Sequence, residues 1–465
     1  MSNPFAKDRS HCPALYQPIV AHCTEESVMS PGTAGGSAPE APSTDDLVRP
    51  QTSTGHPTEG SVSQNRRERT VWSFNSAQEV LFGVGAIARI PTLLRRFNAS
   101  RVALLSDPGV ARAGVLASVE KVMLDAGITL FVYAEAMPEP DMASVLRCEA
   151  AVRAAQPDLL IAVGGGSSMD LAKIIALLLT HGGHPSDYYG ENQVPGPVMP
   201  VIAIPTTAGT GSEVSPVAIV TDDKLNIKVG ISDNRLRPAV ALLDPQLTLG
   251  LPPYITACTG MDALTQAIEA YYGKDFRYID APGDLIYQGS NPLSDYFAEK
   301  AIGMIAEHLP IGMHQGGNLE ARSQLLLGNL YSALAFTNSG VSWVHAVAYP
   351  LAELAPRPHG ELVGLLLPYG MRYNMVVHRD KLARIGELLG APASLSRDAK
   401  CEAGVQRIFQ LLETLGLPSR LSQIGIEEAQ LESIVDDSLN IERLNRINPR
   451  TPRRDDLLAL LRSAL

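Results

Sequence analysis

Hydrophobic residues in the first part of the chain form short, continuous runs that alternate with segments of helical spacing. The runs that are rich in aliphatic and β-branched residues are RVALLSD (101–107), ITLFVYAEA (128–136), DLLIAVGGGS (158–167), VMPVIAIPTT (198–207) and AVALLD (239–244). Between several of them, apolar residues recur three and four positions apart, as on an amphipathic helix. Continuous apolar strands that alternate with helices predict a parallel sheet with helices on both faces.

This pattern has a boundary near residue 70 and another near residue 250. After LPPYITACTG the strand-like runs cease, and helical spacing prevails to the C-terminus. Residues 1–70 are rich in Ser, Thr, Pro and Gly and bury too little apolar surface to offset the entropy of ordering. We therefore expect a disordered extension (1–70), an α/β domain (71–250) and an all-α domain (251–465).

Composition narrows the class of protein. A net charge of -11 over 465 residues argues against a nucleic-acid surface, which needs a basic stripe. The apolar runs are far shorter than the ~20 residues of a membrane helix, and neither a signal nor a transit peptide is recognisable. The five cysteines form no C-x-x-C pair and are expected to be reduced thiols. We expect a cytoplasmic protein without nucleic-acid or membrane partners.

Three glycines connect an apolar run to a helical segment in VGGGSSMDLAKIIALLL. Gly165 and Gly166 allow close approach of the backbone, and the following helix offers unpaired N–H groups and the positive end of its dipole. A pyrophosphate fits such a turn, although the G-x-G-x-x-G fingerprint is absent. The alternative is an ordinary strand-to-helix turn.

A second phosphate-suited loop, IPTTAGTGSEVSP, follows another strand and offers the hydroxyls of Thr206 and Thr207. Hydroxyl-rich turns are common, but two such loops at the carboxyl ends of parallel strands lie where nucleotides bind. Asp107 ends a strand in the same way. Its carboxylate can accept hydrogen bonds from a ribose and repels a 2′-phosphate, which favours NAD over NADP; the alternative is a plain surface aspartate.

A metal site is predicted in the helical part. Asp262 and Gln266 lie four residues apart in GMDALTQAIEAYY and so project from one face of a helix. His345 lies in a second helical segment, and His359 follows a Pro-Arg-Pro break where a third helix would begin. The four side chains can converge on one divalent metal. The alternatives are a surface amide, a first-turn aspartate and a core histidine.

The ordered motifs GGGSSMDLAK, PTTAGTGSEVSPVAIVTD, LLDPQLTLGLPP, TGMDALTQAIEAYY and HAVAYP followed by PHG resemble the iron-containing (group III) alcohol dehydrogenase family. The resemblance extends from about Phe74 to near Asn374. It implies a dehydroquinate synthase-like architecture, with a Rossmann-like nucleotide-binding domain and a helical metal and substrate domain. It also implies NAD, a divalent metal (Fe²⁺ before Zn²⁺) and a homo-oligomer.

By position, the resemblance assigns two sets of residues. The cofactor-side positions are Asp107, Gly165, Gly166, Ser167, Asp170, Thr206, Thr207 and Lys228. The metal-ligand positions are Asp262, Gln266, His345 and His359.

Two positions depart from the family pattern. Gln266 stands where the family has histidine, and an amide oxygen is a poorer ligand for Fe²⁺ or Zn²⁺ than imidazole. Tyr349 stands where many members have a second histidine. This tyrosine and YQGSNPLSD (287–295) resemble the hydroxyacid-oxoacid transhydrogenase branch, whose members keep their nicotinamide cofactor bound between half-reactions.

We expect a metal-dependent oxidoreductase that transfers hydride between NAD and a primary alcohol or hydroxy acid, giving the aldehyde or oxo acid. His345 and Tyr349 are the catalytic candidates, although an ordinary tyrosine pKa of ~10 makes Tyr349 a weak base. Arg277 can meet a substrate carboxylate, but an exposed surface arginine is the commoner case. The alternatives are a transhydrogenase and a catalytically impaired, nucleotide-binding regulatory protein, with a metal-dependent lyase ranked below them.

Overall fold

The computed structural model describes residues 69–222, 227–281 and 283–465, which belong to one compact unit. The predicted disordered extension lies outside this description, apart from its last two residues. In the described part of the chain, no helix combines the length and the apolar character that crossing a bilayer requires.

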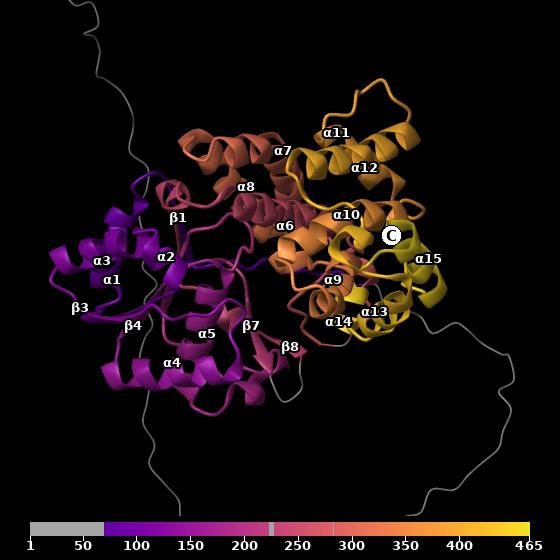
Figure 1. Cartoon of the computed structure of the whole chain (residues 1–465). Coiled ribbons are helices and arrows are strands. Elements are labelled where there is room, and N and C mark those ends of the chain that lie inside the picture. The colour runs from indigo at the N-terminus through magenta and orange to yellow at the C-terminus, as the bar shows by residue number, and fades with distance from the viewer. Residues whose placement is uncertain (1–68, 223–226, 282) are drawn as a thin grey trace, which may run out of the picture. The chain divides into compact units, whose positions relative to one another are not determined.

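A six-stranded sheet forms the centre of the first half (Figure 1). Its strands, in spatial order, are β1 (Glu79–Phe82), β9 (Val240–Leu243), β6 (Val201–Pro205), β4 (Leu159–Gly164), β2 (Arg101–Ser106) and β3 (Thr129–Tyr133). All neighbouring pairs are parallel. A smaller sheet contains β5 (Gly190–Glu191), β8 (Ile227–Ser232) and β7 (Val217–Asp222).

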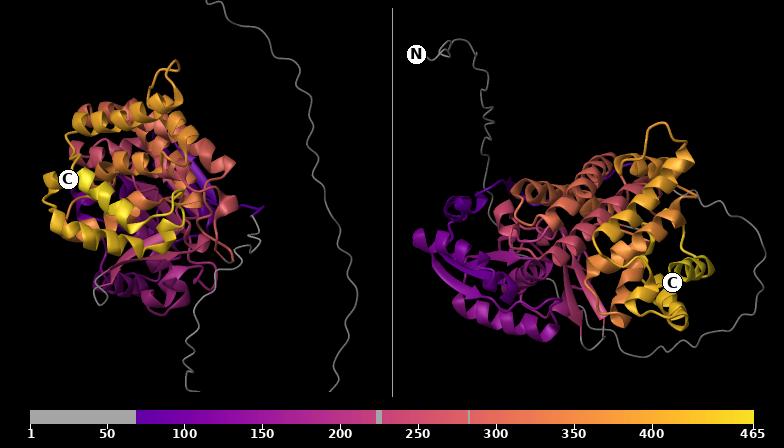
Figure 2. Two further views of the ribbon diagram at one scale, coloured as in Figure 1. Left: turned by 90° about the vertical axis from the view of Figure 1, so that its right-hand side faces the viewer. Right: turned by 45° about the horizontal axis from the view of Figure 1, so that its top comes forward.

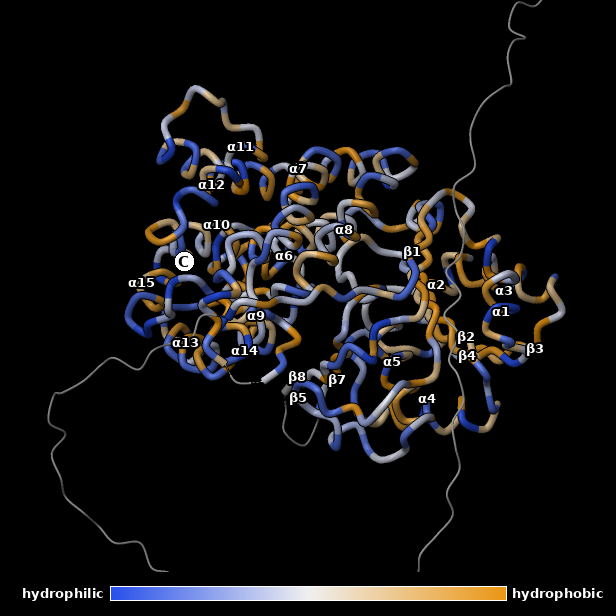
Figure 3. Tube along the Cα trace, turned by 180° about the vertical axis from the view of Figure 1, so that it is seen from behind, coloured by the Kyte–Doolittle hydropathy of each residue, from blue (hydrophilic) through white to orange (hydrophobic). Residues whose placement is uncertain are grey.

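Helices cover both faces of the large sheet. They are α1 (Ile90–Arg96), α2 (Pro108–Arg112), α3 (Val115–Asp125), α4 (Met142–Ala155) and α5 (Gly166–His181). Successive side chains of β4 point to opposite faces, so Leu160 packs with residues of α4 and α5, whereas Leu159 and Ile161 pack with residues of α1 and α3. The strands are mostly hydrophobic along their length (Figure 3). This confirms the predicted α/β fold class.

The second half is helical and begins with α6, which follows the last described strand. Its helices are α6 (Pro253–Tyr272), α7 (Pro292–His314), α8 (Leu319–Ser339), α9 (Trp343–Leu354), α10 (His359–Asn374), α11 (Arg379–Leu388), α12 (Arg397–Thr414), α13 (Leu431–Leu439), α14 (Glu442–Asn445) and α15 (Arg454–Ala464). Helix α6 packs against α7, α8 and α10 and is buried on nearly all sides. Figure 2 shows the helices of this half, in orange and yellow, beside the sheet. The helical part is therefore as predicted, while its separation as a domain remains a prediction.

Candidate active site

Three turns follow neighbouring strands at one edge of the large sheet. Asp107 comes directly after β2, the glycine turn follows β4, and Thr206 follows β6. The ends of these strands are in register, with Ser106 opposite Val163 and Gly164 opposite Pro205. The structure thus brings the three predicted cofactor segments together at the carboxyl edge, where parallel sheets bind nucleotides.

The two phosphate-suited loops lie against each other. A Cβ atom on Gly166 would come within 2.9 Å of Thr210 Cγ2, and one on Gly165 would lie 3.7 Å from Thr207. Helix α5 starts immediately after Gly165, and no described side chain caps its first N–H groups. These donors are therefore available to a phosphate.

Asp107 and Asp170 both hold neighbouring loops. Asp107 accepts hydrogen bonds from the N–H groups of Gly109 (2.8 Å) and Val110 (3.0 Å), and Ser168 Oγ donates to its second oxygen at 3.3 Å. The buried Asp170 carboxylate accepts from Ser212 Oγ and from the N–H of Ile219 (3.1 Å). This placement favours a role for Asp170 in holding the second loop.

Lys228 lies on β8 and interacts both with the first turn of α5, through Glu139, and electrostatically with His359 of the helical half. Its Nζ atom forms an ion pair with Glu139 (2.5 Å). The N–H of Glu139 donates to Ser167 Oγ (3.2 Å), in the first turn of α5. The charges of Lys228 and Glu139 also act on His359. Sequence reasoning missed Glu139, because an acidic residue in an exposed loop carries no recognisable pattern.

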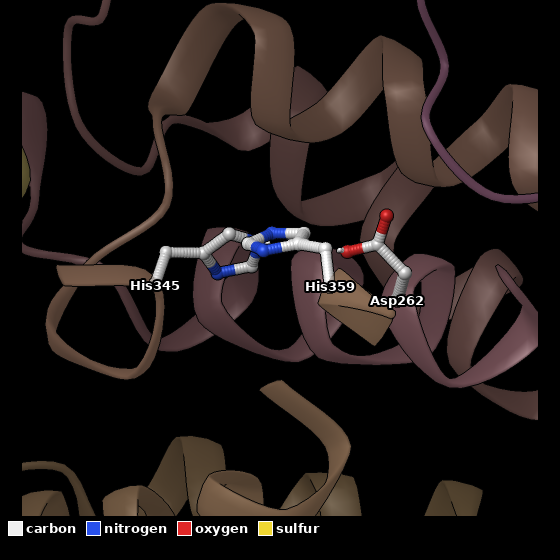
Figure 4. Close-up of side chains that lie close together, drawn as sticks. All are labelled: Asp262, His345 and His359. Atoms are coloured by element: carbon white, nitrogen blue, oxygen red, sulfur yellow. Dashed lines mark ion pairs between the residues drawn. The ribbon is translucent and has the colours of Figure 1, made fainter. Parts of the chain in front are cut away.

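The predicted metal ligands come from three helices. Asp262 lies in α6, His345 in the first turn of α9, and His359 is the first residue of α10. Asp262 Oδ1 is 3.6 Å from His345 Nε2 and 3.9 Å from His359 Nε2, and the ligand atoms all lie within 4.8 Å of one another. The carboxylate and both rings are turned toward one another in Figure 4.

Several atoms of this cluster are buried without a hydrogen-bond partner among the described residues. They are Asp262 Oδ1, Gln266 Oε1 and His345 Nε2. Gln266 lies one turn along α6 from Asp262 and is 5% exposed. Unsatisfied buried polar atoms are costly, and a divalent cation between Asp262, His345 and His359 would satisfy those of the first two. The donor set therefore fits a metal.

Glu269, which the sequence analysis did not single out, supports His345 from the buried side. Its carboxylate accepts hydrogen bonds from Ser342 Oγ and Val344 N, both at 2.8 Å, and contacts His345 Nδ1. When Nδ1 donates to Glu269, Nε2 is the nitrogen that faces Asp262, and it can bind a metal in place of its proton. The seven-residue spacing from Asp262, on the same helix face, was the available signal.

Charge at the two rings differs. Burial by itself lowers the pKa of His345, but Glu269 and Asp262 outweigh this effect and raise the pKa to about 9. The site therefore favours positive charge at this point. Burial lowers the pKa of His359 to about 4, so this ring is neutral near pH 7 and its lone pair can bind a cation.

Comparison with known proteins agrees with this geometry. Residues 77–245 match the family described as iron-containing alcohol dehydrogenase, and residues 256–465 match the Fe-containing alcohol dehydrogenase family, C-terminal. The chain belongs to the iron-containing alcohol dehydrogenase family. It is 31% identical over 386 residues to the NAD-dependent methanol dehydrogenase of Bacillus methanolicus, covering 83% of this chain and 97% of that protein.

Solved structures agree with the family assignment. The crystal structure of a 1,3-propanediol oxidoreductase superposes with a TM-score of 0.80 at 31% identity, covering 85% of this chain and all of that chain (100%). The sulfoacetaldehyde reductase from Bifidobacterium kashiwanohense, in complex with NAD⁺, superposes with a TM-score of 0.74 at 28% identity and covers 85% of this chain and 99% of that chain.

The protein is thus an iron-containing alcohol dehydrogenase, an oxidoreductase that acts on alcohols with NAD. This confirms the predicted family, the enzyme class and the NAD and divalent-metal cofactors. The individual residue roles remain predictions. Tyr349, the second departure from the family pattern, stacks on His359 with ring centroids 6.0 Å apart. Arg277 forms an ion pair with Asp275 (2.9 Å), so its charge is already met.

Proposed function

We propose that the protein is a metal-dependent dehydrogenase that oxidises a primary alcohol or hydroxy acid with NAD. The observation that supports this most strongly is the set of unpartnered acceptor atoms on Asp262, Gln266 and His345 beside His359. When bound, a divalent metal supplies Lewis acidity to an alcohol hydroxyl, and NAD supplies the hydride acceptor. The small alcohols in the names of the relatives agree with a small substrate.

We assign the metal-binding and orienting roles to separate side chains. Asp262, His345 and His359 are proposed to hold the metal, with Gln266 as a weak fourth ligand. Glu269 fixes the orientation of His345 by holding its Nδ1 atom.

The cofactor side of the site is built from the three turns. Gly165 and Gly166 are proposed to admit the pyrophosphate, and Ser167, Thr206, Thr207, Asp107 and Lys228 to position the rest of the dinucleotide. Asp170 would act through the loop that it holds.

The reaction removes a hydride from the alcohol carbon and a proton from its hydroxyl, giving an aldehyde, NADH and H⁺. Tyr349 is the catalytic candidate for passing the proton outward, since its ring stacks on His359. We propose a relay role in which its hydroxyl accepts one proton and donates another within one step.

Substitution of His359 tests the proposal. We expect His359→Ala to abolish alcohol oxidation after loading with Fe²⁺ or Zn²⁺, while NAD binding measured by calorimetry is retained. His314→Ala, on the exposed end of α7, is the matched control and should keep full activity. Full turnover of the His359→Ala protein after exhaustive chelation would overturn the metal role.

The transhydrogenase branch is a second candidate, because the residues that carry this resemblance are neighbours of the proposed site. Tyr349 stacks on His359. Tyr287, in the segment 287–295, lies under an arginine that also interacts with Tyr349. A transhydrogenase retains its nicotinamide, so the purified protein would absorb in the reduced-nicotinamide band after addition of a hydroxy acid alone. A protein without bound metal or turnover would instead support the regulatory alternative.

We further propose that the protein is a cytoplasmic homo-oligomer that does not bind nucleic acids or membranes. Its acidic net charge of -11 and the family resemblance support this. Light scattering coupled to size-exclusion chromatography measures the assembly directly, and a monomer at micromolar concentration would contradict it.

A further inference from the structure

Arg443 places a positive charge next to the proposed catalytic centre. It belongs to the short helix α14, which packs beside α9 (Figures 1 and 3). Its guanidinium lies over the ring of Tyr287, with Cζ 5.0 Å from the ring centroid, and it interacts electrostatically with Tyr349. Since Tyr349 stacks on His359, a single tyrosine ring separates this cation from the metal ligands.

The charge of Arg443 has no carboxylate partner. Within residues 69–222, 227–281 and 283–465, no carboxylate lies at ion-pair distance from its guanidinium. Glu191 acts on it electrostatically, but the Glu191 carboxylate pairs with Arg446 (2.6 Å) and accepts from the N–H of Ile286 (3.3 Å).

Three neighbouring arginines of this segment, by contrast, are paired with acids. Arg446 pairs with Glu191, Arg450 with Asp456 (2.7 Å) and Arg454 with Asp436 (2.6 Å). A partly buried guanidinium held by an aromatic face and a phenol, without an anion, has lost water without full compensation. Guanidinium groups in this situation bind carboxylates and other oxyanions well, through paired N–H donors.

We propose that Arg443 binds the anionic terminal group of the substrate and makes the enzyme selective for short hydroxy acids over neutral alcohols. This inference rests on the proposed function, because it takes the metal cluster as the place where the hydroxyl reacts. The ring of Tyr349 separates the two sites, so hydroxyl and anion must be at opposite ends of the substrate. An ω-hydroxy acid meets this condition and a 2-hydroxy acid does not.

Kinetics on paired substrates test this selectivity. For the Arg443→Met protein we expect kcat/KM for 4-hydroxybutanoate to fall about 100-fold, mainly through KM, because a charge-assisted contact is lost. Activity with 1-butanol should fall much less, so the ratio of kcat/KM for 4-hydroxybutanoate to that for 1-butanol should fall. Arg443→Lys should restore part of the loss, because it returns the charge without the fork of donors.

Two further experiments identify which anionic group is preferred and control for the loss of a positive charge. Isethionate, a hydroxy sulfonate, distinguishes a sulfonate preference from a carboxylate preference, and 2-hydroxybutanoate should be a poor substrate. Arg454→Met removes an exposed, paired arginine from the same part of the chain and should leave the ratio of 4-hydroxybutanoate to 1-butanol activity unchanged.

Binding of butanoate, which lacks the reacting hydroxyl, is measured by calorimetry independently of turnover. We expect binding to the parent protein and none to the Arg443→Met protein. Equal substrate ratios in parent and variant, or equal butanoate binding, would overturn the role of Arg443. If the metal-loaded parent protein oxidised no alcohol but still bound butanoate in an Arg443-dependent way, the proposed function would be overturned. The anion site would remain supported.

Discussion

The two ring nitrogens of His345 have different neighbours, and this difference determines which of them can bind a metal. Nδ1 contacts Glu269, whereas Nε2 is buried without a hydrogen-bond partner among the described residues. Glu269 is itself held by Ser342 and Val344, so the ring cannot rotate without breaking several buried hydrogen bonds. Glu269 is therefore proposed to orient the metal-binding nitrogen of His345 without itself being a ligand.

Replacing Glu269 with glutamine should weaken metal binding. The amide keeps the size of the side chain, but it removes the charge that orients His345 and makes its ring more basic. We expect a 10–100-fold loss of metal affinity with little change in the fold. Metal affinity is measured by competition with a chelator, and circular dichroism reports the fold; unchanged affinity would contradict the orienting role.

Gln266→His tests the first departure from the family pattern, the amide at a proposed ligand position. A third imidazole should bind Fe²⁺ or Zn²⁺ better than the amide oxygen, so we expect slower metal loss to a chelator and higher occupancy after purification. The position is only 5% exposed, so thermal unfolding should accompany the metal titration. If the parent and the histidine variant retain metal equally, Gln266 is not a ligand.

At the scale of elements, the site depends on how closely α10 approaches α6. A Cβ atom on Gly360 would come within 1.9 Å of the Cys258 carbonyl oxygen, which belongs to the α6 backbone. Backbone cannot move aside as a flexible side chain does. The residue after His359 must therefore be glycine for His359 to reach Asp262.

Gly360→Ala should separate the two helices. We expect a loss of about 2–4 kcal/mol in the free energy of unfolding and weaker metal binding, because His359 moves away from Asp262. Gly317→Ala is the matched control, since a Cβ atom there meets nothing within 4 Å. Urea denaturation measures both, and equal stability of the two variants would contradict this packing argument.

The sequence was sufficient to predict the main elements of the large sheet and the helices that hold the ligands. The five hydrophobic runs all contain strands, because buried parallel strands are apolar throughout. Strand β1 was missed because it is a four-residue edge strand with alternating, half-exposed residues. Strands β5, β7 and β8 of the small sheet were also not expected.

The helical spacing of Asp262 and Gln266 was enough to predict that they share one face of a helix, while their roles as ligands remain predictions. The site was not predictable where the role depends on a contact distant in sequence. Glu269 meets His345 76 residues later, and Arg443 meets Tyr287 and Tyr349 from a separate short helix. An arginine that is paired with an acid and one that is not look the same in a sequence, which is why Arg277 was considered first.

At the scale of the whole molecule, buried polar groups join the sheet to the helices. Glu213, in the second phosphate-suited loop, accepts a hydrogen bond from Asn329 of α8 (3.2 Å). Arg237 donates to Val214 O (2.5 Å) and, across to α8, to the carbonyl of Thr337 (2.9 Å). Movement of one half relative to the other must therefore disturb these contacts.

The buried Glu213 makes stability depend on pH. Burial raises its pKa to about 7, from 4.5, so the folded protein keeps this proton where the unfolded chain has released it. The stabilising contribution is complete below pH 4.5 and is lost as pH rises through about 7, by at most about 3 kcal/mol.

Glu213→Gln should remove this dependence. The free energy of unfolding of the parent is expected to fall, relative to that of the variant, between pH 4.5 and 7. Urea denaturation of both proteins at intervals across that window gives the difference, in which other titrating groups cancel. Parallel curves for the two proteins would show that Glu213 is ionised in the folded state.

The cation at Arg443 and the ligands Asp262, His345 and His359 come from separate segments of the chain. The ligands lie in α6, α9 and α10, whereas the arginine lies in α14, a four-residue helix near the C-terminus. If Arg443 selects the substrate as proposed, mutation of this short helix changes which substrates are accepted and leaves the proposed metal ligands in place. Related enzymes could then evolve new substrate specificities through a few substitutions in α14, without losing activity on the way.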